Sequence, residues 1–257
     1  MTTPNRPPRP VHTATVSRTE VTAPDMVRVI LGGDGVRALP DLTFTDHYVK
    51  LKFGEVTRTY TIRWLDRVAN EMAIDFVIHG DEGLAGPWAA SARPGDEVSF
   101  TGPGGAWAPA DDADAHLLVG DEAAIPAIAA ALEALPADAR ASVFLEVASA
   151  DHHQPLRVPS RTTVTWVHRD EHGLPYGEAL VRAVMAAGVP DGVVEAFVHG
   201  NADMVKPLRR FLFGDADLDR ARVSISGYWR TGLNEDRWQS SKREFNAAME
   251  AEDPAGV

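Results

Sequence analysis

The chain of 257 residues contains no cysteine. This absence excludes disulfides, thiolate metal sites, iron–sulfur clusters and a cysteine nucleophile, and it is compatible with a reducing compartment. No apolar run approaches the roughly 18 residues that a membrane-spanning helix needs. The polar, proline-rich segment 1–10 also lacks the apolar core of a signal peptide. We therefore expect a cytoplasmic protein with no membrane partner.

Positive charge is also scarce. The sequence has 25 Lys and Arg residues against 37 Asp and Glu residues, which gives a net charge of −12. Because nucleic-acid binding depends on cationic neutralisation of phosphates, this balance argues against a nucleic-acid partner. Any anionic ligand therefore needs a local basic pocket.

Common catalytic signatures are missing as well. The sequence has no H-E-x-x-H, P-loop, G-x-S-x-G or G-x-G-x-x-G motif. His152 and His153 form an adjacent histidine pair, but neighbouring side chains diverge on a helix or a strand, so we expect no metal site there. We predict no catalytic acid or base, and the candidate residues below are binding residues.

The first part of the chain, about residues 11–110, is β-rich. Its candidate strands are short, are separated by Gly, Pro, Asp and Asn, and predict a small antiparallel barrel. A short helix is expected to begin near Leu84 and to end before Pro94. The predicted strands are His12–Val21, Met26–Leu31, His47–Phe53, Thr57–Trp64, Glu71–Ile78 and Glu97–Phe100.

The second part, about residues 115–227, alternates strands with helices, which predicts a parallel sheet. The domain boundary is expected within 108–115, and a tail with a helix near 234–250 is expected over 228–257. The predicted strands are His116–Val119, Ser142–Val147, Thr163–Val167, Val193–Val198 and Arg222–Ser226. The predicted helices are Ile125–Leu135, Gly177–Ala187 and Ala202–Phe213.

The segment Arg58-Thr-Tyr-Thr-Ile-Arg63 is the most informative motif. Because alternate residues of a strand share a face, Arg58, Tyr60 and Ile62 should point one way and Thr61 the other. A guanidinium beside a phenol suits a ligand with both a phosphate and a flat ring, such as a flavin nucleotide. A half-exposed strand with ordinary cross-strand pairs is equally compatible with the pattern.

Two turns are candidates for ligand contact. Gly83 to Trp88 leads into the short helix, where bare backbone and free N–H groups suit a pyrophosphate. Gly120 to Pro126 follows the first strand of the α/β part, where ligands bind in open sheets. Spacing alone favours an ordinary glycine-rich turn for the first and a plain turn with Asp121 as N-cap for the second.

Taken together, these segments resemble the siderophore-interacting proteins, which are FAD-dependent ferric-siderophore reductases of the ferredoxin–NADP reductase-like superfamily. The resemblance runs from about Val11 to Trp238, and its specificity lies in the order and spacing of several modest motifs. These motifs are Arg58–Arg63, Asp75–Gly80, Gly83–Ala89, Gly120–Ile128, Gln154–Leu156, Val164–Arg169 and Gly227–Arg230.

The resemblance implies a six-stranded antiparallel flavin-binding barrel followed by a nucleotide-binding α/β domain. It implies that NADPH or NADH reduces FAD, which reduces a ferric siderophore and releases ferrous iron. Arg58 would pair with the FAD pyrophosphate, Tyr60 would lie along the flavin ring, and Thr61 would approach its reactive edge. The other implied cofactor residues are Ile62, His79, Gly80, Ala85, Gly86, Pro87, Trp88, Gly120, Asp121, Glu122, Ala123, Pro126, Tyr228 and Trp229.

An anionic ferric chelate would need a basic cluster near the flavin. Lys50 and Lys52 share a face of the strand before Arg58 and are the main candidates, with Arg230 as a further one; a solvated strand face explains the two lysines equally well. Arg140 or Arg169 are candidates for a 2′-phosphate of the donor.

Two positions depart from the family pattern. Ala123 stands where the family usually has threonine, and Asn201 stands where it often has glutamate. These departures leave two alternatives open: another flavin reductase of the same fold, including a ferredoxin-linked one, or a flavoprotein that carries ferric siderophores without turnover.

Overall fold

The computed structural model describes residues 10–78 and 83–252, with side chains up to residue 249. The chain divides into two compact units, Met1–Ala106 and Trp107–Val257, and each is described by itself. Within the described residues, no helix is both long enough and apolar enough to cross a membrane.

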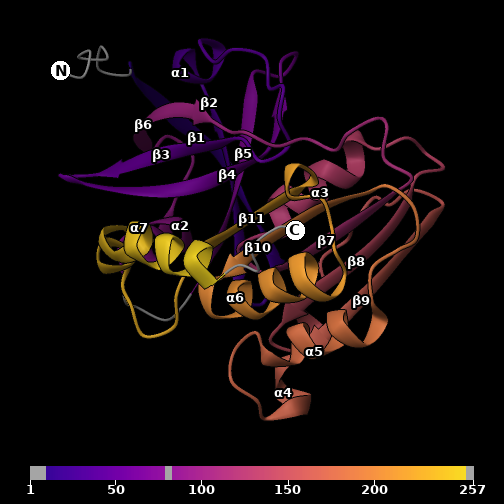
Figure 1. The fold of residues 1–257 in the computed structure, drawn as a ribbon. Coiled ribbons are helices and arrows are strands. Elements are labelled where there is room, and N and C mark those ends of the chain that lie inside the picture. Colours follow the sequence, from indigo (N-terminus) through magenta and orange to yellow (C-terminus); the bar gives the residue numbers. More distant parts are fainter. Residues whose placement is uncertain (1–9, 79–82, 253–257) are drawn as a thin grey trace, which may run out of the picture. The chain divides into compact units, whose positions relative to one another are not determined.

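The first unit is a closed antiparallel barrel with the strand order β1-β2-β5-β4-β3-β6 (Figure 1). This confirms the predicted six-stranded barrel. Its strands are β1 (Val11–Ala23), β2 (Met26–Gly32), β3 (Tyr48–Phe53), β4 (Val56–Asp66), β5 (Glu71–Val77) and β6 (Glu97–Gly104). Two short helices accompany them, α1 (Asp34–Arg37) and α2 (Ala85–Ser91).

Alternate residues of the strands fill the barrel. Val49 and Leu51 of β3, together with Ile74 and Phe76 of β5, are fully buried, while Lys50 between the first two is exposed. This alternation follows from the two-residue period of a strand. Each large apolar side chain buried in this way contributes about 1.5–3 kcal/mol.

The second unit is a parallel five-stranded sheet in the order β11-β10-β7-β8-β9. Its strands are β7 (Ala115–Asp121), β8 (Arg140–Val147), β9 (Arg161–His168), β10 (Val194–Asn201) and β11 (Val223–Trp229). Its helices are α3 (Ile125–Ala134), α4 (Arg169–His172), α5 (Glu178–Ala187), α6 (Ala202–Arg210) and α7 (Glu235–Glu252). The α/β pattern is as predicted, but Tyr228 and Trp229 end the last strand instead of beginning a tail.

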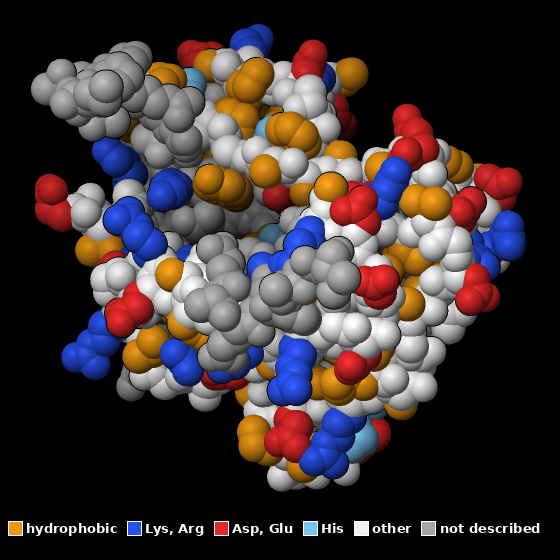
Figure 2. Space-filling view, in the orientation of Figure 1, with side chains coloured by type: hydrophobic (Ala, Val, Ile, Leu, Met, Phe, Trp, Pro, Cys, Tyr) orange, Lys and Arg blue, Asp and Glu red, His pale blue; other side chains and the backbone are white. Residues whose placement is uncertain are grey.

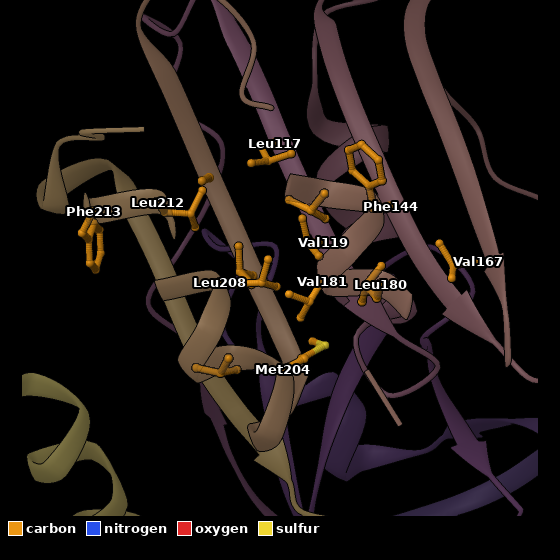
Figure 3. Close-up of a cluster of buried hydrophobic side chains, with 14 of the residues drawn as sticks. Leu117, Val119, Phe144, Val167, Leu180, Val181, Met204, Leu208, Leu212 and Phe213 are labelled. Carbon is orange, nitrogen blue, oxygen red and sulfur yellow. The ribbon is translucent and has the colours of Figure 1, made fainter. Parts of the chain in front are cut away.

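Helices cover both faces of this sheet. Leu117 and Val119 of β7 point to the face covered by α5 and α6, where Leu180 and Leu208 pack against them (Figure 3). Leu118, the residue between them, packs with α3 on the other face. All these side chains are buried, as expected for a parallel strand covered on both faces, and they form the apolar centre of β7, Leu117–Val119.

The strand order places a topological switch point between β7 and β10. From β7 the chain proceeds to β8 and β9 on one side, and then returns to β10 and β11 on the other. In open α/β sheets, ligands bind outside the carboxyl ends of the strands at such a point. Here those ends are Asp121 on β7 and Asn201 on β10.

Gly120 allows the close packing of β7 at this point. A Cβ on Gly120 would lie 2.5 Å from Cβ of Ala124 and 2.9 Å from the carbonyl oxygen of His199. These neighbours belong to the turn before α3 and to β10, so a side chain at residue 120 would push the strand away from both.

We expect Gly120→Ala to lower the free energy of unfolding by about 1–3 kcal/mol, the usual cost of overpacking a core. Urea denaturation at constant m-value measures this change. Gly86→Ala is the matched control, because a Cβ on Gly86 comes no closer than 3.6 Å to its surroundings. A Gly120→Ala variant as stable as the control would show that the packing at β7 is looser than these distances imply.

Glu146 is a fully buried acidic residue near the end of β8. Its two oxygens accept hydrogen bonds from the backbone N–H of Gly177, at 2.9 and 3.3 Å, just before α5 begins. Burial raises the pKa of Glu146 to about 7, against an ordinary value of 4.5, although Arg169 and the Gly177 N–H oppose the shift.

This raised pKa makes stability depend on pH. Between about pH 4.5 and 7 the folded state retains a proton that the unfolded state has lost. The stabilisation is therefore complete below pH 4.5 and is lost as the pH rises through 7. We expect Glu146→Gln, whose amide still accepts from Gly177, to remove a slope of up to about 1.4 kcal/mol per pH unit from the wild-type curve. Denaturation at a series of pH values tests this, and parallel curves for the two proteins would contradict it.

Candidate functional site

In the first unit, Arg58 and Tyr60 lie on the same face of β4, as predicted. Their partners across the ladder are Leu51 and Val49, both fully buried in the barrel core. Arg58 and Tyr60 are half-buried, so they extend the core face of the strand into solvent. Thr61 points to the other face, as its position in the alternation requires.

An aromatic row adjoins Tyr60. The ring of Tyr60 packs on Phe76 with a centroid distance of 4.3 Å, and Phe76 packs on Trp88 of α2 at 5.6 Å. Phe53 packs edge-on against Trp88 at 5.7 Å. Because Phe76 is buried while Tyr60, Trp88 and Phe53 are half-exposed, the row presents an apolar aromatic surface to solvent beside the Arg58 strand.

The predicted pyrophosphate cradle is the start of α2. Ala85 is buried, and Pro87 and Trp88 are half-buried. A Cβ added to Gly86 would fit without a clash, in ordinary van der Waals contact 3.6 Å from the carbonyl oxygen of Val77. The first N–H groups of a helix have no partner within it, so those of Ala85 and Gly86 are suited to an anion. His79 and Gly80, also predicted to line the flavin, lie outside the described residues.

Three further predicted residues of this unit point away from Arg58 or lie inside the barrel. Ile62 is 2% exposed and belongs to the barrel core, and its N–H donates to the carbonyl oxygen of His47 at 2.7 Å, so neither its side chain nor its N–H is available to a ligand. Lys50 and Lys52 point away from the barrel core, opposite Thr59 and Thr57 of β4, whereas Arg58 faces the core. The two lysines therefore lie on the opposite face of the β3–β4 hairpin from Arg58, and their substrate-binding role stays a prediction.

Charged side chains of both signs are mixed over the surface of the protein. In the view of Figure 2, Lys and Arg side chains gather over the β3–β4 hairpin, and acidic and basic groups alternate elsewhere. The exposed Lys50 and Lys52 belong to this hairpin. Positive charge is thus local, as the net charge of −12 led us to expect.

In the second unit, Asp121 is the centre of the switch point. Its side chain is fully buried and accepts hydrogen bonds from three chain segments. Oδ1 accepts from the backbone N–H of Ala123 at 3.0 Å, and Oδ2 accepts from the backbone N–H of Asn201 and from Nε1–H of Trp229, both at 2.8 Å. Asp121 is therefore not the predicted N-cap of α3, a position that Ala124 occupies without any side-chain bond.

Two opposing effects set the pKa of Asp121. Burial, and to a smaller extent the nearby charge of Glu122, raise the pKa of Asp121 to about 7. The three N–H donors favour the ionised form and oppose the shift. A carboxyl group that accepts three hydrogen bonds on two oxygens has the geometry of a carboxylate, so Asp121 is held as an anion that titrates near neutral pH.

Two side chains from the segment that follows β9 bind Glu122. Arg169 makes a two-pronged contact with its carboxylate, and the hydroxyl of Tyr176 donates to Oε2 at 2.6 Å. The guanidinium of Arg169 also stacks over the Tyr176 ring at 4.1 Å, and burial strongly raises the pKa of Tyr176. Arg169 is thus part of an internal cluster, which argues against a role in binding a 2′-phosphate.

Arg140 is also poorly placed for that role. It is the first residue of β8, at the amino end of the sheet, where its guanidinium donates to the carbonyl oxygen of Asp191. The switch point lies at the opposite end.

The remaining predicted residues lie around the same end of the sheet, but several are engaged in internal contacts. Pro126 is buried within the first turn of α3, and of the turn residues only Ala123 is partly exposed. Tyr228 packs edge-on against His199 at 5.0 Å. Arg230 pairs with Asp203 at 2.9 Å and stacks over Phe245, so its guanidinium is engaged within the second unit.

Three residues of these clusters were not among the predicted site residues. Phe76 lies within the Asp75–Gly80 motif, whereas Tyr176 and His199 lie outside the motifs. His199 is buried between Phe197, stacked at 3.8 Å, and Tyr228, and burial lowers its pKa to about 3. Its Nε2 bonds Oγ of Ser224 at 2.9 Å. His199 is therefore a neutral structural histidine. In the described part of the chain, no three His, Asp or Glu side chains are grouped so as to hold a metal ion.

Comparison with known families agrees with this division of the chain. The family model described as siderophore-interacting FAD-binding domain matches residues 54–107. The model described as siderophore-interacting protein matches residues 113–232. Between them, the two matches include the Arg58 strand, the α2 turn and the whole switch point.

Several known proteins are similar over most of their length. An uncharacterised protein of Mycobacterium tuberculosis is 40% identical, over 93% of this chain and 97% of the relative. The ferric vibriobactin reductase of Vibrio cholerae is 33% identical, over 73% and 69% of the two chains. The NADPH-dependent ferric-chelate reductase of Escherichia coli is 28% identical, over 84% and 91%.

A solved structure has the same fold. The crystal structure of the siderophore-interacting protein SipS from Aeromonas hydrophila superposes with a TM-score of 0.82 and 29% identity, over 93% of this chain and 99% of that one. The sequence relatives, the family models and the fold agree. The chain belongs to the siderophore-interacting protein family, and it contains that family's FAD-binding domain.

Proposed function

We propose that this protein is a cytoplasmic oxidoreductase that binds FAD and passes electrons from NADPH or NADH to a ferric siderophore, so that ferrous iron is released. The observation that carries the proposal is the half-buried pair Arg58 and Tyr60 beside an exposed aromatic row, in a chain whose relatives include two named ferric reductases. Fe(II) binds hard oxygen chelators less tightly than Fe(III), which is why reduction would free the metal.

The residues of the first unit suit FAD. The half-exposed rings of Tyr60, Trp88 and Phe53, which pack around the buried Phe76, offer apolar aromatic contacts for the flavin ring. Arg58 and the first N–H groups of α2 offer positive charge and donors for the pyrophosphate. When bound, FAD would supply the redox chemistry, and the protein would bind and orient it. For this reason no acid or base of the chain is needed at either site.

The switch point of the second unit suits the nicotinamide end of the donor better than its phosphates. The Ala123 N–H is already bonded to Asp121, and Pro126 has no N–H, so α3 begins without a phosphate cradle. The surrounding carboxylates of Asp121 and Glu122 would repel a phosphate but not an uncharged dihydronicotinamide ring. The name of the Escherichia coli relative supports NADPH as the donor.

An anionic partner would meet Lys50 and Lys52 on the outer face of β3. Both lysines are exposed, and small polar residues oppose them on β4 and β6. A ferric chelate or an acidic ferredoxin would be attracted to this face.

Absorption spectroscopy of the purified protein tests the proposal. We expect a flavin spectrum that bleaches when NADPH or NADH is added without oxygen and returns when a ferric siderophore is added, with Fe(II) trapped by a ferrous chelator. A protein that binds the chelate but whose flavin is not bleached by NADPH, NADH or reduced ferredoxin would be a carrier, and a colourless protein that takes up no FAD would end the proposal.

The first variant to test is Arg58→Ala. Loss of one charge-assisted hydrogen bond to phosphate costs about 1.5–3 kcal/mol, so FAD affinity should fall about 10- to 150-fold. Fluorescence titration of the apoprotein with FAD measures it. Arg37→Ala, which removes an exposed arginine of α1, is the control and should bind FAD as the wild type does. Unchanged FAD affinity in Arg58→Ala would remove this arginine from the site.

The second variant is Gly86→Val. A Cβ at residue 86 meets no clash with the protein itself, so we expect the barrel to remain folded. Bulk at the start of α2 should nevertheless keep the pyrophosphate away from the backbone and weaken FAD binding at least tenfold. Circular dichroism checks the fold and the same titration measures affinity. If Gly86→Val takes up FAD like the wild type, the cradle lies elsewhere.

A further inference from the structure

We propose that Asp121 is a positioning residue of the donor site: its carboxylate holds the indole of Trp229 across the carboxyl end of β10 and so shapes the surface that receives the nicotinamide. This inference rests on the proposed function, because it assigns a role within the same donor site. It is carried by the hydrogen bonds of the switch point and by the order of the strands.

The first argument is the convergence of three segments on one side chain. The donors to Asp121 come from the turn after β7, from the end of β10 and from the end of β11, through Ala123, Asn201 and Trp229. A buried carboxylate is costly unless hydrogen bonds compensate for its lost hydration. The three segments are therefore held together by a group that is stable only when all of them are in place.

The second argument is the distance that the indole spans. β10 lies between β11 and β7, and Trp229 is the ladder partner of Asn201 on β10. Adjacent strands lie about 4.8 Å apart, so β11 and β7 are separated by about 10 Å. Because Nε1 of Trp229 is 2.8 Å from Oδ2 of Asp121, the ring must cross the end of β10 to reach β7. It thereby lies over the switch point itself.

The ring of Trp229 and the residues that follow it make further contacts that fix their position. Tyr176 packs edge-on against Trp229 with a centroid distance of 4.8 Å. The next residue but one, Thr231, accepts a hydrogen bond from Nδ2 of Asn201 at 2.8 Å, and Arg230 pairs with Asp203. The chain after β11 is thus anchored to β10 and α6, and the half-exposed Trp229 ring is a rigid aromatic wall.

Because of the charged groups around Asp121, its hydrogen bond with the indole of Trp229 depends on pH. The ionisable groups around Asp121 are Glu122, which is the next residue, Glu146 of β8, and Tyr176, which precedes α5. Arg169 is paired with Glu122. Asp203 and Arg230 pair with one another at the ends of β10 and β11. The carboxylate of Asp121 accepts three hydrogen bonds when ionised, and a proton on either oxygen would compete with a donor. Since the pKa of Asp121 is near 7, its hydrogen bond with the indole of Trp229 is present above neutral pH and weakens as the pH falls.

The test combines an observation on the indole with kinetics on the donor. FAD-loaded protein labelled with ¹⁵N at tryptophan has six indole resonances, one for each tryptophan, and Trp229→Phe identifies the one of Trp229. We expect this resonance to shift as the pH falls from 8 to 5.5 and to lose that dependence in Asp121→Asn. Asp112→Asn is the control, because it removes a carboxylate that accepts hydrogen bonds from Arg222. In this variant the Trp229 resonance should shift with pH as it does in the wild type.

Stopped-flow reduction of the bound FAD by NADPH or NADH supplies the second readout. We expect Asp121→Asn and Trp229→Phe each to raise the apparent Kd of the donor about tenfold, the size of effect expected when a hydrogen bond to a charged group is lost. The double variant should be no worse than the poorer single variant, since both remove the same contact. Trp229→Phe keeps the test possible if Asp121→Asn does not fold.

Two results would overturn the inference alone: a Trp229 resonance unaffected by Asp121→Asn, or single-variant effects on donor Kd that are absent or that multiply in the double variant. Failure of the proposed function gives a different result. In that case the wild-type flavin is not reduced by either nucleotide, and the donor role of Asp121 falls with it.

Discussion

The carboxyl end of the parallel sheet in the second unit depends on the hydrogen bonds that the carboxylate of Asp121 accepts. A charge buried at that depth destabilises a protein unless its hydration is replaced. Here the replacement comes from backbone and indole N–H groups of three chain segments that are far apart in sequence. The result is a switch point whose shape is set by one ionisable group, and whose aromatic wall is a consequence of that group.

The two units offer different chemical groups to a ligand. The barrel offers a guanidinium, helix N–H groups and a row of aromatic rings, which suit a ligand with an anionic middle and a flat end. The α/β unit offers carboxylates that are internally paired and an aromatic ring held in place, which suit a neutral ring.

Several arginines of this chain form ion pairs with carboxylates of distant segments. Arg169 binds Glu122 and stacks on Tyr176, Arg222 binds Asp112, and Arg28 binds Asp75. The planar guanidinium suits such two-pronged contacts better than lysine does. Lys50 and Lys52, in contrast, are exposed on the outer face of β3.

The sequence by itself determined the architecture and the Arg58–Tyr60 face. The period of two in β4 and the alternation of strands with helices after residue 115 are local patterns, and hydrophobic burial makes them decisive. The motifs also indicated the family that the comparisons show. Only the tertiary structure decided that Lys50 and Lys52 turn away from Arg58, that Ile62 is core, and that Arg169 is paired internally. It alone joined Asp121 to Asn201 and Trp229, because a hydrogen bond between residues about 80 and 108 positions apart is set by strand order, which no local pattern specifies.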